Sequence, residues 1–187
     1  MVPIAIVPAA GKGARFGGAK LLADVGGEPM LNRTIRSLLD AGIGRVVVVV
    51  SPHALLPVPL LADRRVQTTP NPDPERGMFS SIQAGLSGVV GDPILVLPGD
   101  MPFVRADTIA AVIDAARETG LAVSPRHGGR RGHPVALPGR LRASILAAPA
   151  ESTLKDILAT LGDDRIEIDV DDAGIVRDVD ERKDLKS

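Results

Sequence analysis

Short blocks of Val, Ile and Leu alternate along the chain with segments that have the period of an amphipathic helix. The blocks cover four segments, residues 2–7, 45–50, 94–97 and 121–123. Continuous apolar runs of this length are typical of parallel strands that are buried on both faces. A repeated order of strand, helix and strand builds right-handed crossover units. The alternation therefore predicts an α/β fold with a mostly parallel sheet and helices on both of its faces.

The helical segments carry recognisable start and stop signals. Apolar residues recur at helical spacing in three of them, residues 31–39, 109–116 and 154–161. A glycine follows each segment: Gly42, Gly120 and Gly162. Asp107 is the expected N-cap of the second helix.

Two later strands are expected at 132–137 and 165–170. We expect one of them to run antiparallel, because residues 121–137 leave no room for a crossover helix. No repeat, low-complexity tract or linker divides the sequence. We therefore expect a single domain over residues 1–187.

Composition excludes several classes of protein. The chain has no Cys, which rules out a disulfide scaffold, thiol catalysis and Cys-ligated zinc or iron–sulfur centres. Its net charge of −1 argues against a nucleic-acid partner. No apolar run approaches the roughly 18 residues of a membrane helix. The expectation is a cytoplasmic protein that binds neither nucleic acid nor membrane.

A glycine-rich segment, residues 8–20 with the sequence PAAGKGARFGGAK, directly follows the first strand block. Its small residues allow backbone N–H groups to approach an anion or a flat base. Arg15 and Lys20 add positive charge along it. The pattern favours a loop that cradles a nucleoside triphosphate.

Two other phosphate-binding patterns fit this segment poorly. A dinucleotide fingerprint would need a glycine where Phe16 stands, and an acidic residue after the second strand, which instead ends in Ser51 and Pro52. A Walker loop would need a hydroxyl residue after its lysine, where Leu21 stands. A simple glycine turn stays open as the plainer alternative.

Asp100 follows the strand block at 94–97 after a Pro-Gly pair. Ligands of open parallel sheets lie beyond the carboxyl ends of the strands, and Mg²⁺ usually takes one or two carboxylates together with water and phosphate oxygens. Asp100 is therefore a candidate Mg²⁺ ligand, or else a turn or capping residue. Val179 between Asp178 and Asp180 suggests a short strand before a terminal helix, and either Asp could be the second carboxylate.

Two further segments have a structural and a functional interpretation. Residues 77–86, after Asn71, look like a helix start, where Ser80 or Ser81 either caps the helix or faces a base or ribose. Residues 126–134 gather three Arg and two His around glycines. They form either a solvated basic hairpin or a pocket for an anionic second substrate.

Five segments in this order resemble the signature of the molybdopterin nucleotidylyltransferases: PAAGKGARFGGAK, GMFSSIQAGL, LPGDMP, RGHPV and DVDERKDL. The similarity extends from Ile4 to Leu185. It implies a three-layer α/β/α, Rossmann-like nucleotidyltransferase fold whose mostly parallel sheet has one antiparallel strand. The AAG start and the GDMP segment are more similar to the cytidylyltransferase branch than to the guanylyltransferase branch.

The resemblance also implies roles for individual residues. Arg15 would bind the β- and γ-phosphates and Lys20 the reacting α-phosphate, and both count with Asp100 as catalytic. Mg²⁺ would be held by Asp100 and Asp180, while Arg131 and His133 would lie on the acceptor side. The nucleotide-binding set would be Ala9, Ala10, Gly11, Gly13, Asn71 and Ser81.

The reaction implied is attack of a phosphate monoester, such as the terminal phosphate of molybdopterin, on the α-phosphorus of CTP, with release of pyrophosphate. The expected partners are a nucleoside triphosphate, CTP rather than GTP, a phosphate-bearing pterin and, transiently, a molybdoenzyme maturation protein. The alternatives are a guanylyltransferase, a sugar- or polyol-phosphate nucleotidylyltransferase, and a nucleotide-binding regulator without turnover.

Overall fold

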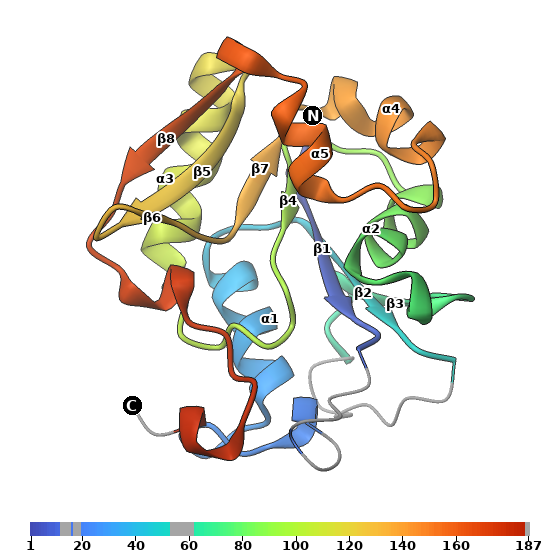
Figure 1. Cartoon of the computed structure of the whole chain (residues 1–187). Helices are drawn as coiled ribbons and strands as arrows, with labels where there is room; N and C mark the ends of the chain where they lie inside the picture. Colours follow the sequence, from blue (N-terminus) through green and yellow to red (C-terminus); the bar gives the residue numbers. More distant parts are fainter. Residues whose placement is uncertain (12–15, 17–19, 53–61, 186–187) are drawn as a thin grey trace.

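One mixed sheet organises the computed structural model, which describes residues 1–11, 16, 20–52 and 62–185. Within these residues eight strands pair in the order β3-β2-β1-β4-β7-β5-β6, and β8 pairs with β5 (Figure 1). Their bounds are β1 Ile4–Ala9, β2 Arg45–Val50, β3 Val66–Pro70, β4 Ile94–Val96, β5 Ala122–His127, β6 Arg130–Arg131, β7 Val135–Leu137 and β8 Arg165–Asp169. The first four in this order, β3 to β4, run parallel to one another, and β8 runs parallel to β5.

The antiparallel strand expected late in the chain is β7. It runs antiparallel to both β4 and β5, and so connects the two parallel parts of the sheet. The two-residue strand β6 also runs antiparallel to β5, in a hairpin with Gly128 and Gly129 at its turn. The predicted fold class, a mostly parallel α/β sheet, is confirmed.

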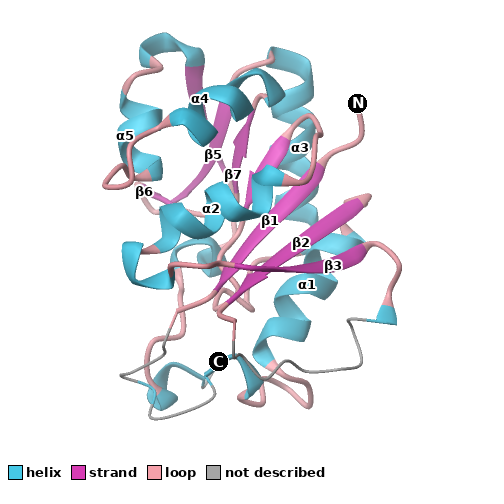
Figure 2. Ribbon diagram, turned by 90° about the vertical axis from the view of Figure 1, so that its right-hand side faces the viewer, coloured by secondary structure: helices cyan, strands magenta, loops and turns pink. Residues whose placement is uncertain are grey.

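Helices cover both faces of the sheet, which makes three layers (Figure 2). Helices α1 and α3 pack on one face, and α2, α4 and α5 on the other. The bounds are α1 Met30–Asp40, α2 Met78–Ser87, α3 Ala106–Thr119, α4 Arg142–Ala147 and α5 Leu154–Ala159. None of the helices within the described ranges has the length and apolarity needed to cross a bilayer.

The period of two along β1 and β2 divides the core into two halves. Ala5 and Val7 face α1 and α3, whereas Ile4 and Ile6 face α2 and its neighbours. Helix α2 approaches the sheet closely at Gly85, where a Cβ would lie 2.8 Å from a methyl carbon of Ile6. This close approach sets the position of the C-terminal half of α2 relative to β1.

Several local predictions are wrong or incomplete. The N-cap of α3 is Arg105 and not Asp107, which lies in the first turn and pairs with the Arg105 guanidinium at 2.9 Å. The chain around Val179 forms no strand, and the terminal helix is only the short 3₁₀ turn η8, Arg182–Leu185. Strand β3 and helix α4 were not predicted.

Candidate functional site

The carboxyl ends of β1 and β4 meet at one edge of the sheet, shown at the bottom of Figure 1. Ala9 and Ala10 are buried at the end of β1, and Gly11 beyond them is exposed. After β4, the Gly99 N–H donates to the Pro8 carbonyl at 3.0 Å. This bond holds the loop that carries Asp100 directly against the start of the glycine-rich segment.

Lys20, Asp100 and Asp180 come together at this edge. The Lys20 ammonium Nζ donates to Asp100 Oδ2 at 2.7 Å and to Asp180 Oδ1 at 2.9 Å. The Lys20 side chain is 11% exposed, and the carboxylates are 27% and 35% exposed. We call this group the Lys20–Asp100–Asp180 cluster. Its members are 80 and 160 residues apart in the chain.

A backbone bond brings the C-terminal segment to the cluster. The Val179 N–H donates to the Asp100 carbonyl at 3.0 Å, and the Val179 side chain is fully buried with Phe16, Val25 and Met30. The two residues next to Val179 lie in different surroundings. Asp180 reaches the cluster, whereas Asp178 is exposed.

The charges of the cluster are coupled to one another. Burial alone lowers the pKa of Lys20, but hydrogen bonds and charges from Asp100 and Asp180 outweigh it, so the pKa is raised above its usual value. Lys20 therefore stays protonated at neutral pH. One ammonium between two carboxylates leaves an excess of negative charge, which a second cation can neutralise.

The donor set of the cluster fits a divalent cation such as Mg²⁺. Asp100 and Asp180 already converge on one cationic nitrogen, and they offer the carboxylate oxygens that Mg²⁺ prefers. Within the described residues there is no group of three or more His, Cys, Asp or Glu side chains that could hold a metal ion alone. The site therefore suits an ion whose remaining ligands are water and phosphate oxygens.

Asn71, Ser80 and Ser81 form a buried hydrogen-bond group beside β3 and α2. The Asn71 amide Nδ2 donates to Ser80 Oγ at 2.8 Å and to Ser81 Oγ at 3.0 Å. Asn71 Oδ1 accepts from the Asp73 N–H at 3.0 Å. The N-cap of α2 is Gly77 and no side chain caps the helix, so the capping interpretation of the two serines is wrong.

Two of the three arginines of the basic hairpin are paired with acids on β8. Arg126 donates to Asp169 at 2.8 Å, and the exposed Arg131 forms a hydrogen-bonded ion pair with Glu167. This part of the hairpin therefore matches the solvated alternative.

His133 is half-buried, and its hydrogen-bond partner is a backbone carbonyl and not an acid. Its Nδ1 lies 3.3 Å from the Val96 carbonyl at the end of β4. Burial lowers the pKa of His133, and the Val96 carbonyl and the charges of Asp100 and Asp178 oppose that shift only in part. At neutral pH the imidazole is therefore uncharged, with one N–H that donates and one ring nitrogen that accepts a hydrogen bond.

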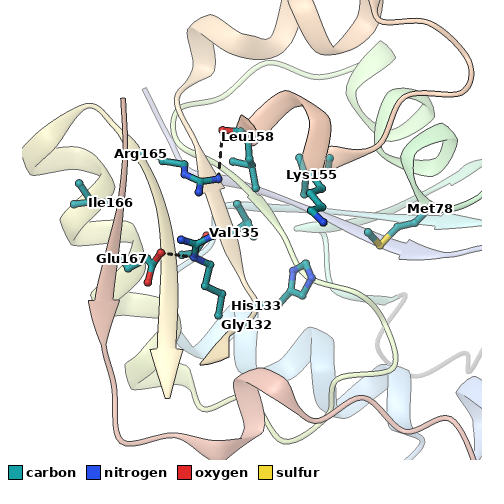
Figure 3. A pocket seen from close by; sticks show the side chains of 12 residues that line it. Met78, Gly132, His133, Val135, Lys155, Leu158, Arg165, Ile166 and Glu167 are labelled. Atoms are coloured by element: carbon teal, nitrogen blue, oxygen red, sulfur yellow. Dashed lines mark hydrogen bonds and ion pairs between the residues drawn. The ribbon is translucent and has the colours of Figure 1, made fainter. Parts of the chain in front are cut away.

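His133 also lines a cavity of about 410 Å³ (Figure 3). Its other lining residues include Arg131, Val135, Leu154, Lys155, Leu158 and Glu167. The contributions of α5 and of Met78 to this cavity were not predicted. The periodicity of 154–161 indicated the apolar face of a helix. It did not indicate which other elements lie next to the polar face of that helix.

Gly13 and Arg15, which were predicted to bind the nucleotide, lie outside the described residues. The remaining predicted residues fall into three neighbourhoods. Ala9, Ala10, Gly11, Lys20, Asp100 and Asp180 lie at the ends of β1 and β4; Asn71 and Ser81 lie beside α2; Arg131 and His133 line the cavity.

A family model for the MobA-like NTP transferase domain matches residues 5–166. The chain belongs to this family. The motif resemblance is thereby confirmed at the level of a nucleotidyltransferase family. The match covers the glycine-rich segment, Asp100 and the basic hairpin, and it ends within β8.

Two relatives of this MobA-like domain carry different names. It is 33% identical over 180 residues to 2-C-methyl-D-erythritol 4-phosphate cytidylyltransferase of Streptomyces coelicolor, covering 86% of this chain and 64% of that one. It is 32% identical over 178 residues to the bifunctional protein GlmU of Anaeromyxobacter dehalogenans, covering 84% and 36%. The chain thus spans less than two thirds of the length of either relative.

Among solved structures, the MobA-like domain is similar to Rv0371c of Mycobacterium tuberculosis. The TM-score is 0.83 at 20% identity, over 100% of this chain and 99% of that one. A complex of Rv0371c with manganese gives a TM-score of 0.71 at 18% identity, over 100% and 97%. At these identities the likeness shows the nucleotidyltransferase fold.

Proposed function

We propose that the chain transfers CMP from CTP to a phosphate monoester, molybdopterin, with Mg²⁺ as cofactor and pyrophosphate as the second product. The observation that supports this most is the Lys20–Asp100–Asp180 cluster, where an ammonium and two carboxylates meet beside the end of β1. Triphosphate binding needs both kinds of charge, because the phosphates attract the ammonium while the carboxylates hold the counter-ion.

The chain needs no nucleophile of its own for this reaction. An oxygen of the acceptor phosphate forms a bond to the α-phosphorus, and the bond from that phosphorus to the bridging oxygen of the pyrophosphate breaks. The pyrophosphate leaves with the electron pair. Catalysis then consists of positioning and charge neutralisation.

The residues divide this work between them. Lys20 would leave the carboxylates to meet the α-phosphate, and Arg15 would bind the departing pyrophosphate. Asp100 and Asp180 would hold Mg²⁺, which when bound neutralises triphosphate oxygens. Asp180 is preferred to Asp178 as second ligand because Asp180 is the one that contacts Lys20. The manganese bound by Rv0371c supports a divalent ion in this fold.

The nucleoside would lie against Ala9, Ala10, Gly11 and Gly13, with Ser81 facing it and Asn71 holding Ser81 in place. CTP is preferred because the AAG and GDMP segments resemble the cytidylyltransferases, and because the Streptomyces relative carries that name. Arg131 and His133 would lie on the acceptor side. A molybdoenzyme maturation protein that receives the product is the partner that this function implies.

A polyol phosphate is the second candidate acceptor, since the Streptomyces relative is named as a 2-C-methyl-D-erythritol 4-phosphate cytidylyltransferase. The deciding assay measures pyrophosphate release with CTP or GTP, Mg²⁺ and either acceptor. We expect release with CTP and molybdopterin only. Release with GTP, or with the polyol phosphate, would replace the proposed substrate, and nucleotide binding without any release would indicate a regulator.

A further inference from the structure

The cavity of about 410 Å³ lies between α5, the first residue of α2 and the strands β5, β7 and β8 (Figure 3). Small-molecule sites commonly have volumes of about 300–1,000 Å³. Apolar side chains from several elements form much of the wall: Val135 from β7, Leu154 and Leu158 from α5, and Met78 from α2. Such walls suit the apolar body of a ligand.

The cationic side chains of the cavity are not equivalent. The Arg131 guanidinium is paired with Glu167, and Arg165 donates to the Leu158 carbonyl at 3.4 Å. Lys155 is exposed, and its side chain makes no hydrogen bond or ion pair with any residue in the described part of the chain. Figure 3 shows the Lys155 side chain directed into the cavity, between Met78 and His133.

The backbone that carries Lys155 is held firmly. Thr153 and Asp156 form a capping box at the start of α5, in which Thr153 Oγ1 accepts from the Asp156 N–H at 3.2 Å and Asp156 Oδ2 accepts from the Thr153 N–H at 2.8 Å. Leu154, next to Lys155, is buried in the core. The ammonium is thus presented from a fixed turn, which lowers the entropy lost when it binds an anion.

His133 connects this cavity to the Lys20–Asp100–Asp180 cluster. The same imidazole lines the cavity and contacts the Val96 carbonyl of β4. The negative charge of Asp100, four residues after Val96, also acts to raise the pKa of His133. His133 is therefore the lining residue that relates the cavity to the cluster.

We infer that this cavity holds the acceptor and that Lys155 is a specificity-determining residue, contacting an anionic group of the acceptor while the aliphatic wall takes its body. This inference rests on the proposed function. The ligand class is an organic phosphate monoester with a partly apolar body. Lys155 contacts the acceptor and not the nucleoside triphosphate.

The kinetic test compares Lys155→Met with Lys155→Arg, and uses Arg117→Met as a matched control. Arg117 is an exposed cation on α3, which covers the other face of the sheet. Loss of a charge-assisted hydrogen bond should raise the KM for molybdopterin about tenfold in Lys155→Met. The kcat and the KM for CTP should stay unchanged, Lys155→Arg should recover most of the loss, and Arg117→Met should behave like the wild type. An unchanged acceptor KM, or a raised KM for CTP, would overturn the inference.

A binding test that does not depend on turnover uses ¹³C-methyl-labelled methionine. The chain has four Met, of which Met78 lines the cavity at 42% exposure, while Met30 and Met101 are buried. Molybdopterin, or 2-C-methyl-D-erythritol 4-phosphate as second probe, is titrated in the absence of CTP. We expect a shift of the Met78 signal only, at about tenfold higher ligand concentration in Lys155→Met.

The two tests separate the two proposals. If neither probe shifts Met78 while CTP still yields pyrophosphate, the acceptor binds elsewhere and only this inference fails. If Met78 shifts as expected but CTP and Mg²⁺ neither bind nor react, the cavity is a binding site and the transferase proposal fails.

Discussion

The two ligand-facing regions of the molecule differ in how their charges are balanced. In the Lys20–Asp100–Asp180 cluster the ammonium lies 2.7 Å and 2.9 Å from carboxylate oxygens that come from two distant segments. In the cavity beside α5, Lys155 has no ionic partner among the described residues, and much of the wall is aliphatic. A charged ligand of the first region must displace existing ion pairs, whereas a ligand of the second can bind Lys155 without breaking one.

This difference sets the size of the effects expected from mutation. Removing one member of the cluster leaves other charges without compensation at the edge of the sheet, so large changes in rate are expected. Removing a side chain from the cavity region weakens one contact with the ligand or with a neighbouring helix, so smaller changes in KM and stability are expected.

The largest effect is expected for Asp100→Ala. Loss of this carboxylate removes one of the two side chains that would hold the metal, and Mg²⁺-dependent pyrophosphate release should fall about 100- to 1,000-fold. Circular dichroism should show an intact fold, because the Asp100 side chain is partly exposed at the end of the sheet. Turnover close to that of the wild type would remove Asp100 from the mechanism.

Lys20→Met should separate two roles of the ammonium. The rate should fall roughly 100-fold, because the α-phosphate loses a positive partner. In the absence of nucleotide, however, the affinity for Mn²⁺ should rise about tenfold, because Lys20 no longer competes for the two carboxylates. A Mn²⁺ titration followed by electron paramagnetic resonance measures this directly, and an unchanged affinity would show that Lys20 and the metal do not share a site.

Asn71→Ala should lower the free energy of unfolding by about 1–3 kcal/mol, because Ser80 Oγ, Ser81 Oγ and the Asp73 N–H each lose a buried partner. Urea unfolding measures the change. Asn32→Ala is the matched control: Asn32 is also buried, but its Oδ1 has no hydrogen-bond partner in the described part of the chain. A loss as large in the control would show that side-chain volume, and not the hydrogen bonds, decides the stability.

The smallest effect is expected for Thr153→Ala, which removes the side-chain cap of α5. Stability should fall by about 1 kcal/mol, and the KM for the acceptor should rise less than in Lys155→Met. Thr160→Ala, at the other end of α5, leaves the cap intact and should not change that KM. Equal effects of the two threonine variants would contradict a specific role for the capped turn.

The sequence predicts the centre of this fold well and its edges poorly. Strand β2 has the bounds expected from its run of Val, and α1 ends before Gly42 as expected. Strand β3 was missed because it is an edge strand, in which only Val66 is buried and Pro70 ends the segment. An exposed edge strand lacks the run of apolar residues from which a buried strand is predicted.

The same physical limit applies to the site. The position of Asp100 could be predicted because the carboxyl ends of parallel strands lie at one edge of the sheet. That prediction requires only the apolar block that precedes Asp100 in the sequence. The preference for Asp180 over Asp178 depends on a tertiary contact, because Asp180 is hydrogen-bonded to Lys20, which lies 160 residues away in the sequence. Lys155 could not be predicted, since the cavity it borders is formed by elements from four parts of the chain.

Anomalous scattering from a crystal grown with Mn²⁺ and a non-hydrolysable CTP analogue tests the central claim most directly. We expect one metal peak bound by Asp100 and Asp180, with the Lys20 ammonium moved from the carboxylates to the α-phosphate. A peak away from both carboxylates, or a Lys20 that still joins them beside a bound triphosphate, would contradict the claim that this cluster is the transfer site.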